Sequence, residues 1–145
     1  MPVPGQMDLL TDWAPSEPVE RFDSVMVRAS SITGRISKAV AASLKGKNRD
    51  DIAKRMSDYL GTPFSKAMLD SYASEAREDH VISVPRLIAL IHATRDRRLL
   101  QIFADDFGWA VVEGKHVHRI AQAEIEDKIK ELSRQQEYLR RRARG

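Results

Sequence analysis

The chain has 145 residues, 42% of them hydrophobic, which suits one compact domain of roughly 100 residues with appended segments. It contains no cysteine, and this excludes disulfide bonds and thiolate zinc sites. No apolar run approaches the roughly 20 residues that cross a bilayer, and the acidic start lacks the features of a signal peptide. We therefore expect a soluble, intracellular protein with no membrane partner.

The net charge of +3 is distributed unevenly. Lys and Arg counted against Asp and Glu give −3 for residues 1–30, +4 for 31–60, −1 for 61–112 and +3 for 113–145. Two basic zones fit a polyanionic partner such as nucleic acid, because phosphate contacts supply most non-specific affinity. Ordinary solvated helix faces would produce the same blocks, so the charge pattern leaves that alternative open.

Prolines dominate the start of the chain. Four prolines within residues 1–20 remove backbone donors and bias their neighbours to extended conformations, so residues 1–29 are predicted to form an extended, flexible arm. A helical domain is predicted for residues 30–108. Its first helix is predicted from apolar residues that recur at every fourth position and form a stripe along one face. These residues are Ile32, Ile36, Val40 and Leu44. This helix is expected to end near Gly46.

Two helices joined by a short turn come next. Asn48 is predicted to cap the first, and Gly61-Thr62-Pro63 to end it. Ser65 is predicted to cap a second helix over Lys66–Arg77. The expected buried residues are Ile52, Ala53, Met56, Tyr59 and Leu60 in the first helix, and Met68, Leu69, Tyr72, Ala73 and Ala76 in the second.

The remaining pattern predicts three more helices. Ser83 caps the most apolar one, the expected central core helix with Leu87, Ile88, Leu90 and Ile91. A fifth helix, Arg97–Phe107, ends at Gly108. Residues 109–145 are predicted to form a short extended segment, then an uninterrupted charged helix over Val117–Arg142 and a basic tail.

The second and third predicted helices have the layout of a helix-turn-helix. In that motif a small residue in the first helix allows close crossing, and an apolar residue followed by Ser or Thr opens the recognition helix. Ile52-Ala53 and Phe64-Ser65-Lys66-Ala67-Met68-Leu69 supply these features. This resembles the helix-turn-helix of the lambda repressor and Cro family over roughly Ile32–Gly108. The separation of eleven positions between Ala53 and Phe64 is longer than in the compact motif. The sequence therefore does not determine the angle between the two helices.

The resemblance implies an all-α, five-helix, lambda-repressor-like domain that places its third helix in the major groove of double-stranded DNA. Base-facing positions would be Lys66, Ala67, Asp70 and Ser71, and phosphate contacts would come from Ser65, Lys54 and Arg55. Asp70 and the following acidic residues would repel a phosphate backbone that they faced. A helical module that merely shares the topology is the alternative.

A second resemblance carries a biological setting. Tyr72-Ala-Ser-Glu-Ala-Arg-Glu-Asp-His, the later Leu-Ile-Ala-Leu-Ile-His-Ala-Thr, and the order of arm, helical domain and charged helix look like a small early-region protein of Mu-like transposable phages. This resemblance implies phage DNA metabolism in the cytoplasm of a bacterial host.

The arm contains one apolar island, Gln6-Met7-Asp8-Leu9-Leu10. It resembles the short motif by which bacterial replication proteins bind the sliding clamp: Gln, an aliphatic residue, Asp or Ser, Leu, then Phe or Leu. Gln6 would bond at the pocket rim, while Leu9 and Leu10 would fill apolar pockets. Alternatively, Leu9, Leu10 and Trp13 cover a patch of the protein's own domain.

The last predicted helix offers a pairing surface. Ile125, Leu132 and Leu139 occupy one core position of a heptad, and Gln122, Ile129 and Gln136 occupy the other. A homodimer through Ile125, Ile129, Leu132 and Leu139 is expected, with docking on the protein's own core or a solvated helix as alternatives. The basic run Arg140, Arg141 and Arg142 is a candidate phosphate-binding segment. Alternatively, it is a tail that only contacts solvent.

No enzymatic motif is found in the sequence. His116 and His118 flank Val117, a spacing that matches no familiar zinc site, and no phosphate loop or nucleophile elbow is present. We therefore expect no catalysis, no metal and no cofactor.

The hypothesis from the sequence is a DNA-binding regulator of phage transcription or transposition. The rival is an adaptor that holds the sliding clamp or another host protein through the arm.

Overall fold

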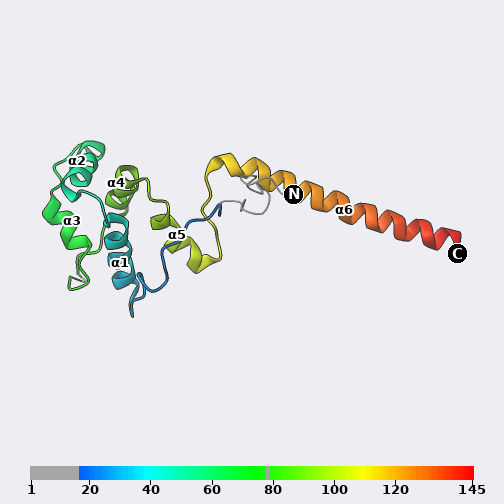
Figure 1. Ribbon diagram of the computed structural model, residues 1–145, viewed down its shortest axis with the longest axis horizontal. Helices are drawn as coiled ribbons and strands as arrows, with labels where there is room; N and C mark the ends of the chain where they lie inside the picture. Colours follow the sequence, from blue (N-terminus) through cyan, green and yellow to red (C-terminus); the bar gives the residue numbers. More distant parts are fainter. Residues whose placement is uncertain (1–16, 78) are drawn as a thin grey trace, which may run out of the picture. The chain divides into compact units, whose positions relative to one another are not determined.

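The computed structural model describes residues 17–77 and 79–145, and every regular element in this part of the chain is helical. The prediction of an all-α protein is therefore confirmed. The elements, shown in Figure 1, are α1 (Ile32–Leu44), α2 (Arg49–Leu60), α3 (Lys66–Tyr72), α4 (Val84–Thr94), α5 (Arg98–Ala104), α6 (Val117–Arg144) and the 3-10 turns η1 (Asp105–Phe107) and η2 (Gly114–His116).

Helices α1 to α5 belong to one compact unit, Val19–Val111, and α6 belongs to a separate one. The arm predicted for residues 1–29 therefore overlaps the compact unit from Val19 onward. Phe22 explains the overlap, because its side chain is buried and the guanidinium of Arg98 lies over its ring, 4.3 Å from the centroid. The aromatic side chain ties this stretch of chain to α5.

Each predicted cap forms a hydrogen bond. The side chain of Asn48 accepts from the backbone N–H groups of Asp50 and Asp51, which begins α2. Ser65 accepts from the N–H of Met68 and begins α3, and Ser83 begins α4 in the same way. These bonds satisfy backbone donors that the first helical turn leaves unpaired. Helix α2 ends at Gly61, whose φ of 69° lies in the left-handed region that favours glycine.

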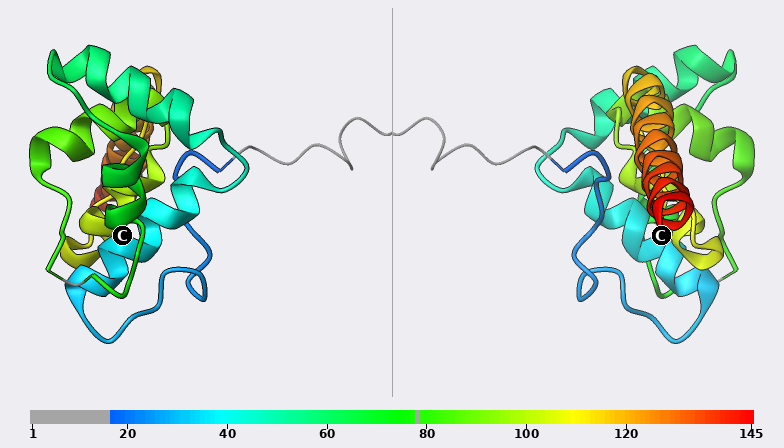
Figure 2. Two further views of the ribbon diagram at one scale, coloured as in Figure 1. Left: turned by 90° about the vertical axis from the view of Figure 1, so that its left-hand side faces the viewer. Right: turned by 90° about the vertical axis from the view of Figure 1, so that its right-hand side faces the viewer.

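The core lies where α2 meets α4, the most extensive contact between helices in the Val19–Val111 unit. Figure 2 shows these helices crossing one another rather than running in parallel. The buried apolar residues on the five helices are Ala39, Val40, Leu44, Ile52, Ala53, Met56, Leu69, Tyr72, Ala89, Leu90, Ala93, Leu99 and Ile102. Helix α4 is thus part of the core, as predicted.

Four residues expected to be buried lie instead at the surface: Ile32, Tyr59, Ile88 and Ala76. Ile32 is 67% exposed because it is the first residue of α1, beyond the packed turns. Tyr59 is half exposed, and its ring stacks on the ring of His92 from α4 with centroids 4.2 Å apart. Ile88 is 43% exposed on the outer side of α4. The apolar patterns marked these helices correctly but overestimated the width of their buried faces.

Helix α3 is shorter than predicted and ends at Tyr72 rather than Arg77. The N–H of Ala73 donates to the carbonyl oxygens of Leu69 and Ser71, and successive turns follow. After Tyr72 the expected inward face has only alanines, and Ala76 is exposed. A face of alanines buries too little apolar area to hold further turns of helix.

Gln101 fixes the end of the compact unit. Its buried side chain donates to a carboxylate oxygen of Asp105 (2.6 Å) and the carbonyl of Trp109 (3.1 Å), and accepts from the N–H of Val111 (2.6 Å). The predicted extended segment after Gly108 is therefore held by a side chain rather than by a neighbouring strand. Phe107 and Trp109 stack on each other and remain exposed.

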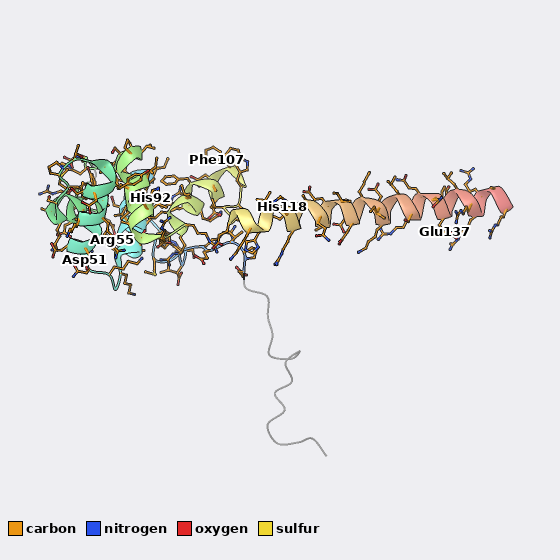
Figure 3. The ribbon with its side chains drawn as sticks, turned by 90° about the horizontal axis from the view of Figure 1, so that it is seen from above. Asp51, Arg55, His92, Phe107, His118 and Glu137 are labelled. Carbon is orange, nitrogen blue, oxygen red and sulfur yellow. The ribbon has the colours of Figure 1, made fainter. Side chains whose placement is uncertain are left out.

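Helix α6 has 28 residues and none of them is buried. It begins at Val117 as predicted and extends two residues beyond the predicted end, to Arg144. Figure 3 shows its side chains, including those of His118 and Glu137, standing out along its whole length. In the described parts of the chain, no helix combines the length and the apolar character that crossing a membrane requires.

Candidate nucleic-acid interface

The candidate reading helix is α3, which has one buried and one exposed face. Leu69 and Tyr72 are buried in the core. Lys66 and Ala67 are exposed, and Asp70 and Ser71 lie one turn further along the same face, partly exposed. The four residues predicted to face base edges therefore share one surface. Ser65 is exposed at its start, with its hydroxyl engaged as the cap.

Asp70, the acidic residue on this face, is paired with two cations. Its carboxylate oxygens lie 2.7 Å from the guanidinium of Arg49 on α2 and 3.2 Å from the ammonium of Lys66. The hydrogen bond from Arg49 is the main cause that lowers the pKa of Asp70. The group of three side chains carries a net charge of +1, so the carboxylate holds two basic side chains in place instead of presenting an isolated negative charge.

A hollow beside α3 gathers basic side chains from the α3–α4 connection and from the first turn of α4. It has a volume of about 380 Å³. We call it the α3 hollow. The residues that line it are Ala67, Met68, Ser71, Tyr72, Arg77, His80 and Arg86. None of the described residues that line it is a carboxylate, although Asp79 lies 3.7 Å from His80 at its edge. The exposed face of α3 is thus bordered by groups that attract anions.

Arg86 is the most constrained of these basic groups. Its guanidinium donates a hydrogen bond to the hydroxyl of Tyr72. It also lies 5.5 Å from the ring centroid of Phe64 and 5.8 Å from that of Tyr72. Two aromatic rings and one hydroxyl therefore fix the charge next to α3. Arg77, in contrast, is exposed and forms no ion pair within the described chain, so its guanidinium is free to meet an anion.

A second groove is lined by Lys38, Lys45 and Arg49, together with Met26, Ala41, Ala42 and Glu75, and has a volume of about 350 Å³. Lys38 lies 3.8 Å from Glu75 and also donates to the backbone carbonyl of Arg28. Lys45 is exposed and has no ion-pair partner among the residues that the structure describes. Arg49 joins this groove to the face of α3 through its ion pair with Asp70.

The basic residues predicted to contact phosphate lie elsewhere. Arg55 donates to the backbone carbonyl of Ala93 near the end of α4 (3.5 Å), one turn along α2 from Asp51 (Figure 3). Lys54 is exposed, and neither it nor Arg55 lines the α3 hollow. Arg140, Arg141 and Arg142 are on α6, where Arg141 pairs with Glu137 at 3.3 Å.

Sequence reasoning did not single out Arg49, Arg77 or Arg86 for this surface. No spacing rule links them, because they come from α2, from the α3–α4 connection and from α4. The segment Gln6–Leu10, proposed to bind the sliding clamp, lies outside the described residues. Within the described ranges no three His, Asp or Glu side chains are placed to hold a metal ion together.

Comparison with protein-family models, with curated proteins and with solved structures finds no match for this chain. Over the described residues, the fold is that of an all-α protein with a compact five-helix unit and a long exposed helix.

Proposed function

We propose that the Val19–Val111 unit binds double-stranded DNA through the face of α3, and that the protein is a sequence-reading regulator of phage transcription or transposition. The observation that carries the proposal is the α3 hollow, in which Arg77, His80 and Arg86 border the exposed face of the helix. The phage setting rests on the resemblance of residues 72–80 and 87–94. The adaptor hypothesis depends on Gln6–Leu10, and no observation on the described residues favours it.

An α-helix such as α3 can enter the major groove. With its side chains a helix is about 10–12 Å across, and the groove is about 12 Å wide. Lys66 offers donors to base edges or phosphates, and Ala67 offers a methyl group that suits the methyl of thymine. The hydroxyl of Ser71 donates to the carbonyl of Met68 (2.6 Å), so its oxygen would accept a hydrogen bond from a base amino group. Arg77 would contact the phosphate backbone beside the helix, because a flexible, unpaired guanidinium binds phosphate without reading sequence. Asp70 would keep Arg49 and Lys66 in position and limit non-specific attraction.

The test is equilibrium binding of the full chain to duplex DNA from its own genomic neighbourhood and to scrambled duplex, by fluorescence anisotropy across a salt series. We expect preference for the native duplex and a steep loss of affinity as salt rises. Arg77→Ala should weaken binding to both duplexes equally and reduce the salt slope by about 1. Lys66→Ala combined with Ser71→Ala should abolish the preference.

Arg28→Ala is the matched control, because it removes the same charge from an exposed residue that does not line the α3 hollow. Circular dichroism of each variant checks that the helices are retained. Absence of binding at low salt would refute the proposal. Equal effects of Arg77→Ala and Arg28→Ala would refute the placement of DNA at α3.

A further inference from the structure

Helix α6 presents an apolar stripe that nothing in the described chain covers. Ile125, Ile129, Leu132 and Leu139 are each between 51% and 64% exposed. Their spacing of four, three and seven residues places them along one side of the helix. Four large apolar residues aligned on one side form a surface typical of helix pairing, because water contact of such a stripe is unfavourable.

The ends of α6 carry opposite charges. Its first eleven residues, 117–127, contain one Arg and three acidic residues, for a net charge of −2. Its last eleven, 134–144, contain five Arg and one Glu, for a net charge of +4. Much of this charge has no partner in the described chain: Glu124 and Asp127 form no ion pair, and neither do Arg134, Arg140 and Arg144.

We propose that α6 pairs with α6 of a second copy of this chain in antiparallel orientation. The acidic segment 117–127 of each copy then faces the basic segment 134–144 of the other, and Ile129 meets Leu132 across the centre. Paired helix axes lie about 10 Å apart, close to the Debye length of about 8 Å at physiological salt, so facing segments act on each other electrostatically. The inference concerns α6 alone and does not depend on DNA binding.

The rival orientation is parallel. It would align Gln122 with Gln122 and Gln136 with Gln136 at the core, an arrangement that allows side-chain hydrogen bonds. It would also place two segments of net charge +4 side by side. In addition, the side chain of Gln122 is already bonded to Glu126 at 3.1 Å, which draws it away from the stripe. Charge therefore favours the antiparallel pair.

The two orientations predict different distances near the start of the helix. At 1.5 Å per residue, an antiparallel pair centred between residues 130 and 131 separates the two copies of Arg119 by about 35 Å, and the two copies of Arg134 by about 15 Å. A parallel pair brings both positions to within about 20 Å. The chain has no cysteine, so Arg119→Cys and Arg134→Cys each provide a single labelling site.

The experiment combines sedimentation equilibrium of the full chain with spin-label distance measurement on these two variants. We expect twice the monomer mass, a long distance at Arg119→Cys and a short one at Arg134→Cys. Short distances at both positions would overturn the antiparallel orientation. A monomer at all concentrations up to about 100 μM, far above the dissociation constants of specific pairs, would overturn self-association itself.

A pair of substitutions tests whether the stripe is the contact. Ile129→Asp puts a charge in the stripe and should shift the protein to the monomer mass, with at least a tenfold weaker self-association. Ala123→Asp adds the same charge on the opposite side of α6 and should leave the dimer mass unchanged. Both are exposed positions without partners in the described chain. Retention of the dimer by Ile129→Asp would overturn the proposal.

Discussion

Among the described residues, Asp96 is the one charged residue that is buried, and its side chain is only 5% exposed. It follows α4 and precedes α5. Its carboxylate accepts two hydrogen bonds from the guanidinium of Arg98 (2.8 and 2.7 Å) and one from the N–H of Arg98 (3.1 Å). Burial alone would raise the pKa of Asp96, but the hydrogen bonds and the charge of Arg98 outweigh it and lower the pKa below its usual value.

Asp96→Asn should therefore destabilise the fold in a pH-dependent way. Because the pKa of Asp96 is lowered by folding, its ionised form stabilises the native state above the unfolded pKa of about 3.9, and this contribution is lost as pH falls below that value. At pH 7 the variant should lose about 1–3 kcal/mol of unfolding free energy, and the difference from wild type should shrink at pH 3 and below. Urea unfolding at pH 7, 5 and 3 measures this.

The exposed Asp58 supplies the comparison for that measurement. It has no hydrogen-bond or ion-pair partner within the described residues. Asp58→Asn should change the unfolding free energy by less than about 0.5 kcal/mol at any pH. Equal effects of the two substitutions would mean that the Asp96–Arg98 pair contributes nothing to stability.

At the scale of the element, the end of α5 depends on Gln101. Gln101→Met keeps the length of the side chain and removes all three of its hydrogen bonds, to Asp105, Trp109 and Val111. We expect a loss of about 1–3 kcal/mol, because the carbonyl of Trp109 and the N–H of Val111 lose their partner in part-buried hydrogen bonds. The segment that follows Gly108 should also loosen, which hydrogen exchange measured by NMR would detect as faster exchange of the Val111 N–H. Gln135→Met, on the exposed surface of α6, should leave both quantities unchanged.

The elements that could be predicted from the sequence are those with local signals. Asn48, Ser65 and Ser83 begin helices through bonds that span only two or three residues, so the residue type and its position are sufficient. The early end of α3 could not be predicted in this way, because it depends on which side chains after Tyr72 find a surface to cover.

The candidate site shows the same division. Lys66, Ala67, Asp70 and Ser71 could be placed on one face from helical periodicity alone. The pairing of Asp70 with Arg49 joins residues 21 positions apart, and the contact of Arg86 with Tyr72 joins residues 14 positions apart. Such contacts depend on how α2, α3 and α4 pack, and a single sequence carries no signal for them.

At the scale of the whole molecule, the chain separates a compact unit from a long helix that buries none of its residues. An antiparallel α6 pair would place the first residues of its two helices at opposite ends of a rod of about 40 Å. Each end continues into one Val19–Val111 unit. Two such units on one DNA duplex would then bind with an avidity that neither has alone.

This division predicts that residues 19–111 fold without the rest of the chain. Because α6 contributes no buried residue, the fragment should keep the unfolding free energy of the full chain to within about 1 kcal/mol, measured by urea unfolding with circular dichroism. It should sediment as a monomer and bind the native duplex at least about tenfold more weakly, because paired units gain effective concentration from their connection. A fragment that folds and binds as tightly as the full chain would separate DNA recognition from α6 pairing. One that fails to fold would show that the compact unit needs residues outside 19–111.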